Sequence, residues 1–326
     1  MTLQAGLLGY PIEHSLSPAL HNAAYAELGL DWEYRLYPCE NVDAFQAHLA
    51  RARQNPLDYL GFNVTTPWKL EAYRACTLRS PEVEICHSAN VLGFGQADSA
   101  DRSSLRAATT DGAGVWNFLR DSAGLQLAGA SIVLCGTGPA AASILLTLLQ
   151  NQAGSVTVLS RDAQQAQVEV SALVRRYGET RYRKSMQKLS GQPISQLHAA
   201  VGAAVQDYQQ LPPIPPVQVA GYDQAGEHLA QAVVLIDATP LGMSAGDAPV
   251  VPAELLHSGL AVLDLVYGHG ETTLLAAARA AGAQAFDGLG MLVEQAALTI
   301  EFWARAKGHS GLVAPRELMY KTAGGR

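Results

Sequence analysis

A long segment without a charged side chain, residues 122–160, constrains this chain more than any other feature of its sequence. Such a segment would cross a membrane only if roughly 18 to 20 of its residues formed one apolar run. Here residues 136–139 read Gly-Thr-Gly-Pro and interrupt the run, and residues 150–152 read Gln-Asn-Gln and close it. The apolar residues on either side of the glycines instead predict a buried strand over 131–134 and a buried helix over 139–150.

The turn between that strand and that helix has the spacing Gly-x-Gly-x-x-Ala, from Gly136 to Ala141. The first glycine permits a tight turn, the second lets the backbone approach a pyrophosphate, and the small alanine lets the helix pack closely on the strand. The free amides at the N-terminus of the helix then face negative phosphates. We therefore predict a dinucleotide site at this turn; the alternative is a plain tight turn.

The residues that follow the next predicted strand, 155–159, indicate which dinucleotide binds. An NAD site usually places an acidic residue here to bind the ribose hydroxyls, whereas this chain has Ser160 and Arg161. An arginine suits the 2′-phosphate of NADP. We therefore expect NADP, and NAD remains the alternative because Asp162 follows directly.

The composition excludes several classes of protein. The chain of 326 residues has 22 Lys plus Arg against 29 Asp plus Glu, a net charge of −7, and 48% of its residues are apolar. A disordered chain would be poorer in apolar residues, and a nucleic-acid-binding protein would be expected to carry a basic face. At roughly 100 to 200 residues per domain, the length predicts two domains.

The cysteines and the N-terminus suggest where the protein works. Residues 1–6 lack the basic and long apolar regions of a signal peptide. Cys39, Cys76, Cys86 and Cys135 include no CxxC pair, which is typical of reducing surroundings. We expect a cytoplasmic monomer or homodimer with a small-molecule substrate and no membrane or nucleic-acid partner. No metal site is predicted, because the histidines form no HExxH motif or cluster with ligand spacing.

Strand-like and helix-like segments alternate along the chain and predict the α/β class. In the first hundred residues they are 5–9, 19–28, 34–37, 42–52 and 59–64. From Gly112 onward the predicted strands are 131–134, 155–159, 233–236, 262–265 and 284–286. These strands are short and aliphatic, as parallel strands buried on both faces are. The second unit is therefore expected to be a doubly wound, Rossmann-like domain.

Residues 178–226 fit this alternation poorly. They hold Arg181, Arg183, Lys184 and Lys188, followed by Leu-Pro-Pro-Ile-Pro-Pro at 211–216. Proline lacks an amide donor and disfavours a helical conformation in the preceding residue, so the second part cannot form a regular helix. We interpret the segment as an insertion within a crossover connection; a partner-binding surface is the alternative.

Polar motifs of the first unit are candidates for chemistry. Ser17 before a proline is a typical helix start, and Ser15 adds a second hydroxyl to a loop that enters a helix, where anions are favoured. Lys69 follows a strand and a polar turn; a lysine removed from water there could exchange a proton with a carbonyl or hydroxyl group. Asp111, just before the second unit, is a potential partner of Lys69.

Taken in order, these motifs resemble the shikimate dehydrogenase family. The resemblance rests on G-x-P-x-x-H-S-x-S-P-x-x-H-N at 9–22, N-V-T-x-P-x-K at 63–69, Asn90, T-D-G at 110–112, A-T-P-L-G-M at 238–243, D-L-V-Y at 264–267 and D-G-L-G-M-L-V-E-Q-A at 287–296. It covers nearly the whole chain apart from 178–226. It implies an NADP-dependent reduction of 3-dehydroshikimate to shikimate in aromatic amino acid (chorismate) biosynthesis.

The resemblance also implies a division into domains and a role for each motif residue. Residues 1–111 would form the substrate domain, with the C-terminal helix of 291–326 packing back on it, and residues 112–290 the NADP-binding Rossmann domain. Lys69 would transfer the proton and Asp111 would orient it. The substrate would be bound by Ser15, Ser17, Thr65, Lys69, Asn90, Asp111, Tyr267 and Gln295. The cofactor would be bound by Gly136, Thr137, Gly138, Pro139, Ala140, Ser160, Arg161, Leu265 and Gly288.

The chain departs from the family pattern at several positions. Val91 and Thr109 replace a common threonine and asparagine, Asp237 replaces an asparagine near the cofactor, and His269 replaces a proline or small polar residue. Pro139 removes one amide from the pyrophosphate turn. These departures leave two other functions open. One is an NAD-dependent quinate/shikimate dehydrogenase or a paralogue acting on an aminated analogue; the other is a non-catalytic nucleotide-binding regulatory or scaffolding protein.

Overall fold

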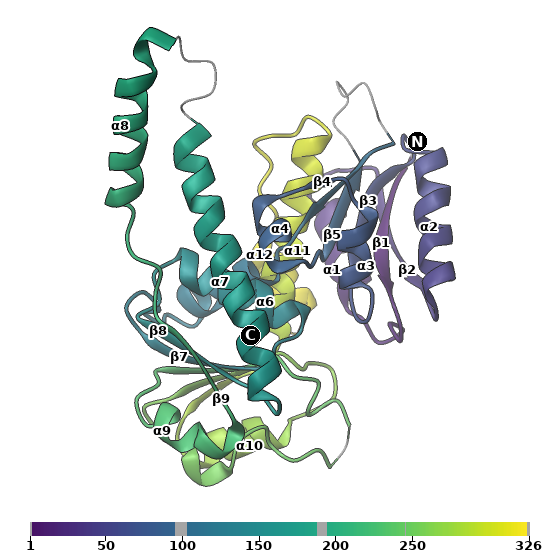
Figure 1. Ribbon diagram of the computed structural model, residues 1–326. Coiled ribbons are helices and arrows are strands. Elements are labelled where there is room, and N and C mark those ends of the chain that lie inside the picture. Colours follow the sequence, from purple (N-terminus) through teal and green to yellow (C-terminus); the bar gives the residue numbers. More distant parts are fainter. Residues whose placement is uncertain (1, 95–102, 188–193, 245, 325–326) are drawn as a thin grey trace.

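Two α/β units lie side by side in the protein, each built on a six-stranded sheet (Figure 1). The structure is a computed structural model, and it describes residues 2–94, 103–187, 194–244 and 246–324. The α/β class expected from the alternating segments is confirmed. The charge-free residues 122–160 lie in the second unit, where they form its first strand, first helix and second strand.

The sheet of the first unit has the strand order β2-β1-β3-β5-β6-β4. Strand β1 pairs in parallel with β2 and β3, whereas β5 is antiparallel to both β3 and β6. The strands are β1 (Leu3–Gly9), β2 (Trp32–Pro38), β3 (Tyr59–Val64), β4 (Leu78–Arg79), β5 (Val91–Phe94) and β6 (Leu105–Ala108). Because parallel strands end at the same edge of a sheet, the segments that follow β1 and β3 emerge together.

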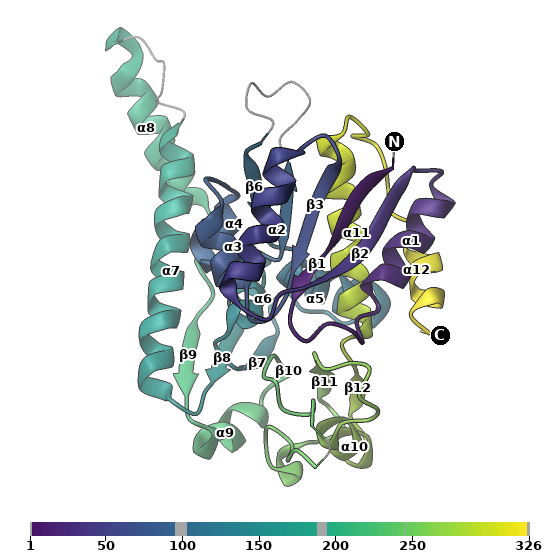
Figure 2. The same cartoon turned by 90° about the vertical axis from the view of Figure 1, so that its right-hand side faces the viewer.

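Helices from both ends of the chain cover this first sheet. The N-terminal ones are α1 (Ser17–Glu27), α2 (Val42–Gln54), α3 (Lys69–Ala75) and α4 (Pro81–Cys86), and the C-terminal ones are α11 (Leu289–Ala306) and α12 (Arg316–Thr322). Figure 2 shows α11 and α12 returning to the N-terminal unit. Trp303 of α11 is fully buried there, and its indole N–H donates to the Leu92 carbonyl at 2.9 Å. The last helices therefore share a core with the first sheet.

The sheet of the second unit is entirely parallel and has the order β12-β11-β10-β7-β8-β9. Numbered within the unit this is the doubly wound order 3-2-1-4-5-6. Its strands are β7 (Ser131–Cys135), β8 (Ser155–Leu159), β9 (Val217–Ala220), β10 (Val234–Asp237), β11 (Ala261–Asp264) and β12 (Gln284–Phe286). Its shorter helices are η3 (Tyr222–Gln224), α9 (Ala225–Leu229), η4 (Ala253–Leu255) and α10 (Thr273–Ala280).

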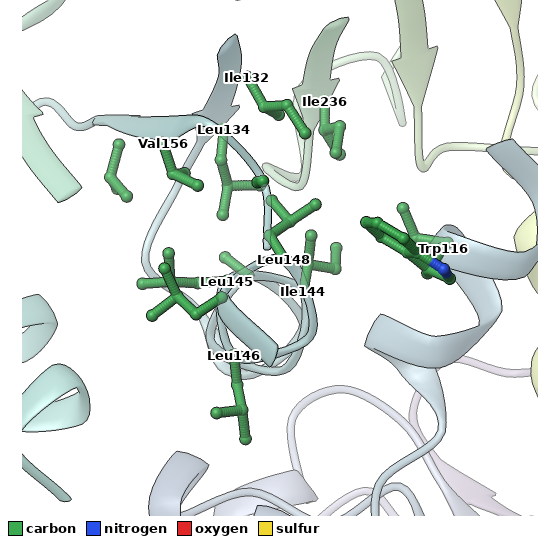
Figure 3. Close-up of a cluster of buried hydrophobic side chains, with 14 of the residues drawn as sticks. Trp116, Ile132, Leu134, Ile144, Leu145, Leu146, Leu148, Val156 and Ile236 are labelled. Atoms are coloured by element: carbon green, nitrogen blue, oxygen red, sulfur yellow. The ribbon is translucent and has the colours of Figure 1, made fainter. Parts of the chain in front are cut away.

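Helix α6 (Pro139–Gln150) explains why the segment around it carries no charge. Figure 3 shows most of its leucine and isoleucine side chains beside those of β7, β8 and β10, whereas Leu146 points to the opposite side. Ile144 and Leu148 are at most 1% exposed, as is Leu134 on the strand that they face. An ionised side chain here would be buried without a partner, which is costly. In the part of the chain that the structure describes, no helix is long and apolar enough to cross a membrane.

Helices α7 (Ala163–Met186) and α8 (Ile194–Gln210) form an arm that extends beyond the sheet of the second unit (Figures 1 and 2). The expected insertion, 178–226, runs through the end of α7, through α8 and through the proline-containing residues 211–216, which form no helix. It also contains β9, which pairs with β8 in register. The interpretation of 178–226 as an insertion throughout was therefore wrong for Val217–Ala220, a strand of the sheet.

The two units meet at α5 (Asp111–Asn117), which continues into the π-helical turn η1 (Phe118–Ser122). Gly112 lets α5 cross α6 closely: its amide donates to the Ser143 hydroxyl at 3.0 Å, and a Cβ on it would lie 2.2 Å from the Ser143 carbonyl oxygen. The other side of α5 packs on α11. Asp111, the first residue of α5, is consequently held at the junction between the units.

Candidate active site

Lys69 and Asp111, the two candidate catalytic residues, are in direct contact. Lys69 begins α3 and Asp111 begins α5, so the pair joins a helix of the first unit to the junction between the units. The Lys69 ammonium Nζ donates to Asp111 Oδ2 at 2.7 Å, and the two side chains are only 13% and 5% exposed. A charge-assisted hydrogen bond in such a secluded place holds the ammonium group in one orientation.

Asn90 holds the other oxygen of the Asp111 carboxylate. Its side-chain amide donates to Asp111 Oδ1 and to the Thr110 hydroxyl, each at 2.9 Å, and its carbonyl oxygen accepts the Thr110 amide at 2.8 Å. The same amide lies 3.4 Å from Gln295 Oε1 on α11. The structure thus brings Lys69, Asp111, Asn90 and Gln295 into one hydrogen-bonded group.

Ser15 and Ser17 lie on the loop from β1 into α1, and this loop reaches the second unit. The Ser15 hydroxyl donates to the Ser17 hydroxyl and accepts the Ser17 amide, both at 3.2 Å. Ser15 also lies near Tyr267, which follows β11. Burial raises the pKa of the Tyr267 phenol, and the nearby Ser15 hydroxyl lowers it by less. The tyrosine is therefore a neutral donor and acceptor that faces the serine loop.

Thr65 and a pair of histidines complete this edge of the first sheet. The Thr65 amide donates to the Leu8 carbonyl at 2.9 Å, so the residue lies against the end of β1. A Cβ on Gly9 would lie 2.3 Å from Thr65 Cγ2. Nearby, the rings of His14 and His269 meet edge to face, with 5.4 Å between their centroids. The unusual residue at 269 thus adds a second contact between the serine loop and the other unit.

Three buried polar residues support these loops and were not predicted from the sequence. The Tyr34 hydroxyl donates to Asn63 Oδ1 at 3.0 Å and lies near the Ser17 hydroxyl. The Asn63 amide donates to the Asn90 carbonyl at 3.2 Å and to the Thr299 hydroxyl at 3.1 Å. Asn63 belongs to the N-V-T-x-P-x-K motif, which was a usable signal for it; Tyr34 and Thr299 have none in their local sequence.

His21 packs beneath the same loop and does not act as an acid or base. Its ring stacks on Tyr34 with 4.1 Å between centroids, and its Nδ1 lies 3.1 Å from the Tyr25 hydroxyl. Burial lowers the pKa of His21 to about 3. The imidazole is therefore neutral at physiological pH, and its visible role is to fill and order the core under Ser17.

The predicted pyrophosphate turn connects β7 to α6 with the backbone exposed. Gly136 has a φ of 97°, a conformation that other residues adopt only with strain. Gly138 is the N-cap of α6 without a side-chain cap, and Pro139 occupies the first helical position. The proline has no amide to offer, but the amides of Ala140 and Ala141 have no acceptor within the helix. Thr137 lies between the two glycines, half-exposed. The turn therefore suits an anionic phosphate.

Ser160 and Arg161 follow β8 beside this turn, and the structure accounts for the acid next to them. The Asp162 carboxylate accepts the Gln165 amide at 2.9 Å and so caps the N-terminus of α7, while its own amide donates to the Ser160 hydroxyl at 3.3 Å. Arg161 is exposed, and its charge acts on Tyr222 beyond β9. The cation is thus available at the end of β8, and the following acid has a structural role.

Two buried carboxyl groups end the neighbouring strands β10 and β11. Asp237 pairs in register with Asp264, and each is 1% exposed. Asp237 Oδ1 accepts the Thr239 amide at 2.9 Å, and Asp264 Oδ2 accepts the Thr272 hydroxyl at 2.6 Å. Burial raises the pKa of Asp237 to about 7 and also raises that of Asp264. Because Thr239 lies against Gly136, the charge of Asp237 changes near neutral pH beside the pyrophosphate turn.

Leu265 and Gly288 link the nucleotide turn to the substrate loops. The Leu265 amide donates to the Asp237 carbonyl at 3.0 Å, and a Cβ on Gly288 would lie 2.1 Å from the Leu265 carbonyl oxygen. Tyr267 is two residues further along the same loop, and Gly288 directly precedes α11, which carries Gln295. The loop after β11 and the start of α11 therefore connect the candidate cofactor residues to the candidate substrate residues. Among the residues that the structure describes, no three His, Cys, Asp or Glu side chains are grouped to hold a metal ion.

A parallel doubly wound sheet, an open glycine turn at its first helix and a lysine–aspartate pair at the junction of the two units define a two-domain, dinucleotide-dependent oxidoreductase. The family model for the shikimate dehydrogenase substrate binding domain matches residues 7–92. The chain is 31% identical to the shikimate dehydrogenase (NADP(+)) of Methanocella arvoryzae, with 98% of this chain and 97% of the relative aligned. The chain belongs to the shikimate dehydrogenase family.

Further relatives support the same assignment. The chain is 34% identical to the shikimate dehydrogenase (NADP(+)) of Acidovorax ebreus over 93% of its own length and 92% of the relative. Its fold matches the crystal structure of shikimate 5-dehydrogenase from Thermus thermophilus in complex with NADP(H) and shikimate, with a TM-score of 0.74, 25% identity and 98% of each chain covered. The family resemblance inferred from the sequence motifs is therefore confirmed.

Proposed function

We propose that this protein is an NADP-dependent shikimate dehydrogenase, which reversibly reduces 3-dehydroshikimate to shikimate. The observation that carries the proposal is the 2.7 Å contact between Lys69 Nζ and Asp111 Oδ2, at the junction of the two units. A lysine held by a buried carboxylate next to a nucleotide turn is the proton donor that a carbonyl reduction needs. The family membership supports the same reaction, because relatives over the full chain are NADP-dependent shikimate dehydrogenases.

When bound, NADP supplies or accepts the hydride in this chemistry. Lys69 donates a proton from Nζ to the carbonyl oxygen as the hydride reaches the carbonyl carbon, and it removes the proton from the hydroxyl in the reverse direction. Asp111 orients the ammonium group and balances its charge, and Asn90 keeps the carboxylate in place through Oδ1. The protein thus contributes position and a proton.

The substrate is a polyhydroxylated carboxylate, and its two kinds of group have different partners in the proposed site. Ser15 and Ser17, adjacent hydroxyls at the start of α1, suit the carboxylate. Neutral Tyr267 is close to Ser15 and suits the same group. The ring hydroxyls would contact Thr65, Asn90 and Gln295, whose side chains both donate and accept hydrogen bonds.

The proposed preference for NADP over NAD rests on the residues that follow β8. Arg161 is exposed there, and Asp162 is occupied as the cap of α7, so the 2′-phosphate meets a cation. Gly136, Thr137, Gly138, Pro139 and Ala140 would hold the pyrophosphate, Ser160 the adenosine end, and Leu265 and Gly288 the nicotinamide end.

Two further proposals concern the division of the chain and its compartment. We assign residues 1–111, together with the C-terminal helix of 291–326, to the substrate domain, and residues 112–290 to the nucleotide domain. The return of α11 to the first core supports this division. We also propose a cytoplasmic enzyme, because all four cysteines are free, buried thiols.

Initial rates with each pairing of NADP or NAD with shikimate or quinate test the proposal. The expected result is turnover of shikimate with NADP at a kcat/KM at least tenfold above that of every other pair. A clear preference for NAD and quinate would overturn the assignment. Absence of turnover with all four pairs, in a protein that still binds NADP, would favour a regulatory function instead.

A further inference from the structure

The arm formed by α7 and α8 has no role in the proposed reaction, yet it is a large part of the nucleotide unit. Among the residues of α8 whose side chains are described, 200–210, only Ala204 is buried. Val201 and Val205 are each 39% exposed, and Tyr208 is 37% exposed. A helix that leaves most of its apolar side chains in water usually has a further surface to cover them.

The arm is basic, whereas the rest of the protein is acidic. Helices α7 and α8 together contain five lysines and arginines against three acids, a net charge of +2; the remaining chain has 17 cations against 26 acids, a net charge of −9. Two of the five cations hold the arm in place, because Arg176 donates to the Ile85 carbonyl and Arg181 to the Pro212 carbonyl. Arg175, Arg183 and Lys184 are exposed. Arg175 and Arg183 share one acid, Glu179, at 3.9 and 4.0 Å, so an excess of positive charge remains; these three cations are called the basic side of the arm below.

The groups beside this basic side suit a protein partner. Tyr182 of α7 and Tyr208 of α8 meet edge to face with 5.4 Å between their ring centroids, and Tyr182 is 50% exposed. Together with Gly178, Glu179 and Arg183 they line a surface hollow of about 410 Å³. Tyrosine and arginine are the residue types that most often dominate the energy of protein interfaces.

An acidic surface that complements the arm lies at the other end of the same unit. After the arm, residues 211–278 contain no lysine or arginine, while they contain seven aspartates and glutamates. Three of these acids, Asp223, Glu227 and Glu254, are exposed on η3, α9 and η4, which pack against one another. In both Figure 1 and Figure 2 the arm points toward one end of the molecule and α9 lies at the opposite end.

We propose that the arm docks on a second copy of this chain, with its basic side against the acidic surface of α9, η3 and η4. Two copies arranged antiparallel about a twofold axis satisfy both contacts at once, because each arm then reaches the acidic end of the other copy. An arm-to-arm dimer is disfavoured, since it would bring the cations of both copies together. The exposed valines and tyrosines of the arm supply the apolar part of the interface.

Sedimentation velocity of the full chain over a range of protein concentrations, at low and at high salt, tests this arrangement. A dimer is expected at low salt, and its dissociation constant should rise as salt screens the charges. The double variant Arg183→Glu/Lys184→Glu should weaken dimerisation by about 100-fold or more, because like charges then face each other. The control variant Arg51→Glu/Arg106→Glu changes the net charge equally, on the substrate unit, and should leave the dimer intact.

A charge-exchange rescue separates docking from a folding defect. Asp223→Lys/Glu227→Lys should also weaken the dimer, and combining both double variants in one chain should restore it, because each interface again pairs opposite charges. Shikimate oxidation per monomer should stay unchanged, since none of these residues belongs to the proposed site. A native chain that stays monomeric, a dimer insensitive to the arm charges, or a combined variant without rescue would each overturn the proposal. A monomer whose arm instead binds a poly-glutamate peptide would also overturn it.

Discussion

Replacing Asp237 by asparagine should make the protein more stable at alkaline pH and leave its stability unchanged in acid. Asp237 ends β10 with 1% of its surface exposed, and its Oδ1 accepts the Thr239 amide at 2.9 Å. Burial raises the pKa of this carboxyl from 3.8 to about 7, and the neighbouring charge of Asp264 adds to the effect. An asparagine keeps an oxygen for the Thr239 amide and has no charge to bury.

The sign and size of this stability change follow from the pKa values of the Asp237 carboxyl in the folded and in the unfolded chain. Below pH 3.8 it is protonated in both the folded and the unfolded chain and contributes no pH dependence. Between 3.8 and about 7 the folded chain keeps the proton while the unfolded chain loses it, so stability falls as pH rises. Above that window the loss of unfolding free energy is complete. It amounts to about 4 kcal/mol, since each tenfold difference in proton affinity corresponds to about 1.4 kcal/mol. Asp237→Asn removes that cost.

Urea unfolding of the native protein and of Asp237→Asn at about pH 4.5 and about pH 8.5 measures the effect. The difference in unfolding free energy should be about 1 kcal/mol at the lower pH and should grow to about 4 kcal/mol at the higher pH. Asp223→Asn, on an exposed residue, is the matched control and should show no such growth. Equal differences at both pH values, or a variant that is less stable in alkali, would refute the reasoning.

Three further substitutions test the cofactor site and the core. Arg161→Ala should raise the KM for NADP by about 10-fold or more, through loss of a charged hydrogen bond, and should leave the KM for NAD unchanged. Arg175→Ala is the control. An unchanged KM for NADP in Arg161→Ala would exclude this arginine from the 2′-phosphate site. Gly136→Ala should weaken NADP binding and should also lower the unfolding free energy by about 1–2 kcal/mol, because Gly136 has a φ of 97°. Gly124→Ala, the control, should lower the unfolding free energy alone. Equal NADP affinity in both variants would contradict the proposed pyrophosphate turn. Trp303→Ala should lower the unfolding free energy by about 3–5 kcal/mol in urea titrations, and a loss under about 1 kcal/mol would show that α11 does not hold the first core together.

Much of the nucleotide unit could be predicted from local sequence, because a charge-free apolar segment broken by two glycines has few ways to fold. The expected strand and helix at 131–134 and 139–150 correspond to β7 and α6. Strand β9 was missed because it directly follows the proline-containing residues 211–216, whose pattern indicated an irregular connection. Its place in the sheet comes from pairing with β8, which no local signal reports.

The contacts of the candidate active site were also beyond local sequence patterns, because they join residues that are far apart in the sequence. Motifs along the chain drew attention to Lys69 and Asp111, but only the fold reveals that they are 2.7 Å apart. Tyr34 and Thr299 escaped notice because each is joined to the site through Asn63, and the Asn63–Thr299 hydrogen bond spans 236 positions in sequence. A local pattern cannot identify a buried polar residue whose partner lies at the other end of the chain.

Lys69 carries the proton in the proposed reaction, and the kcat of Lys69→Ala for shikimate oxidation with NADP tests this most directly. The expected result is a kcat lower by about 100- to 10,000-fold, the usual contribution of a general acid or base, with the dissociation constant for NADP unchanged in a fluorescence titration. Lys321→Ala, on an exposed helix far along the chain, serves as the control and should keep the native rate. A Lys69→Ala enzyme that retains kcat within about threefold would contradict the assignment of the proton to this residue.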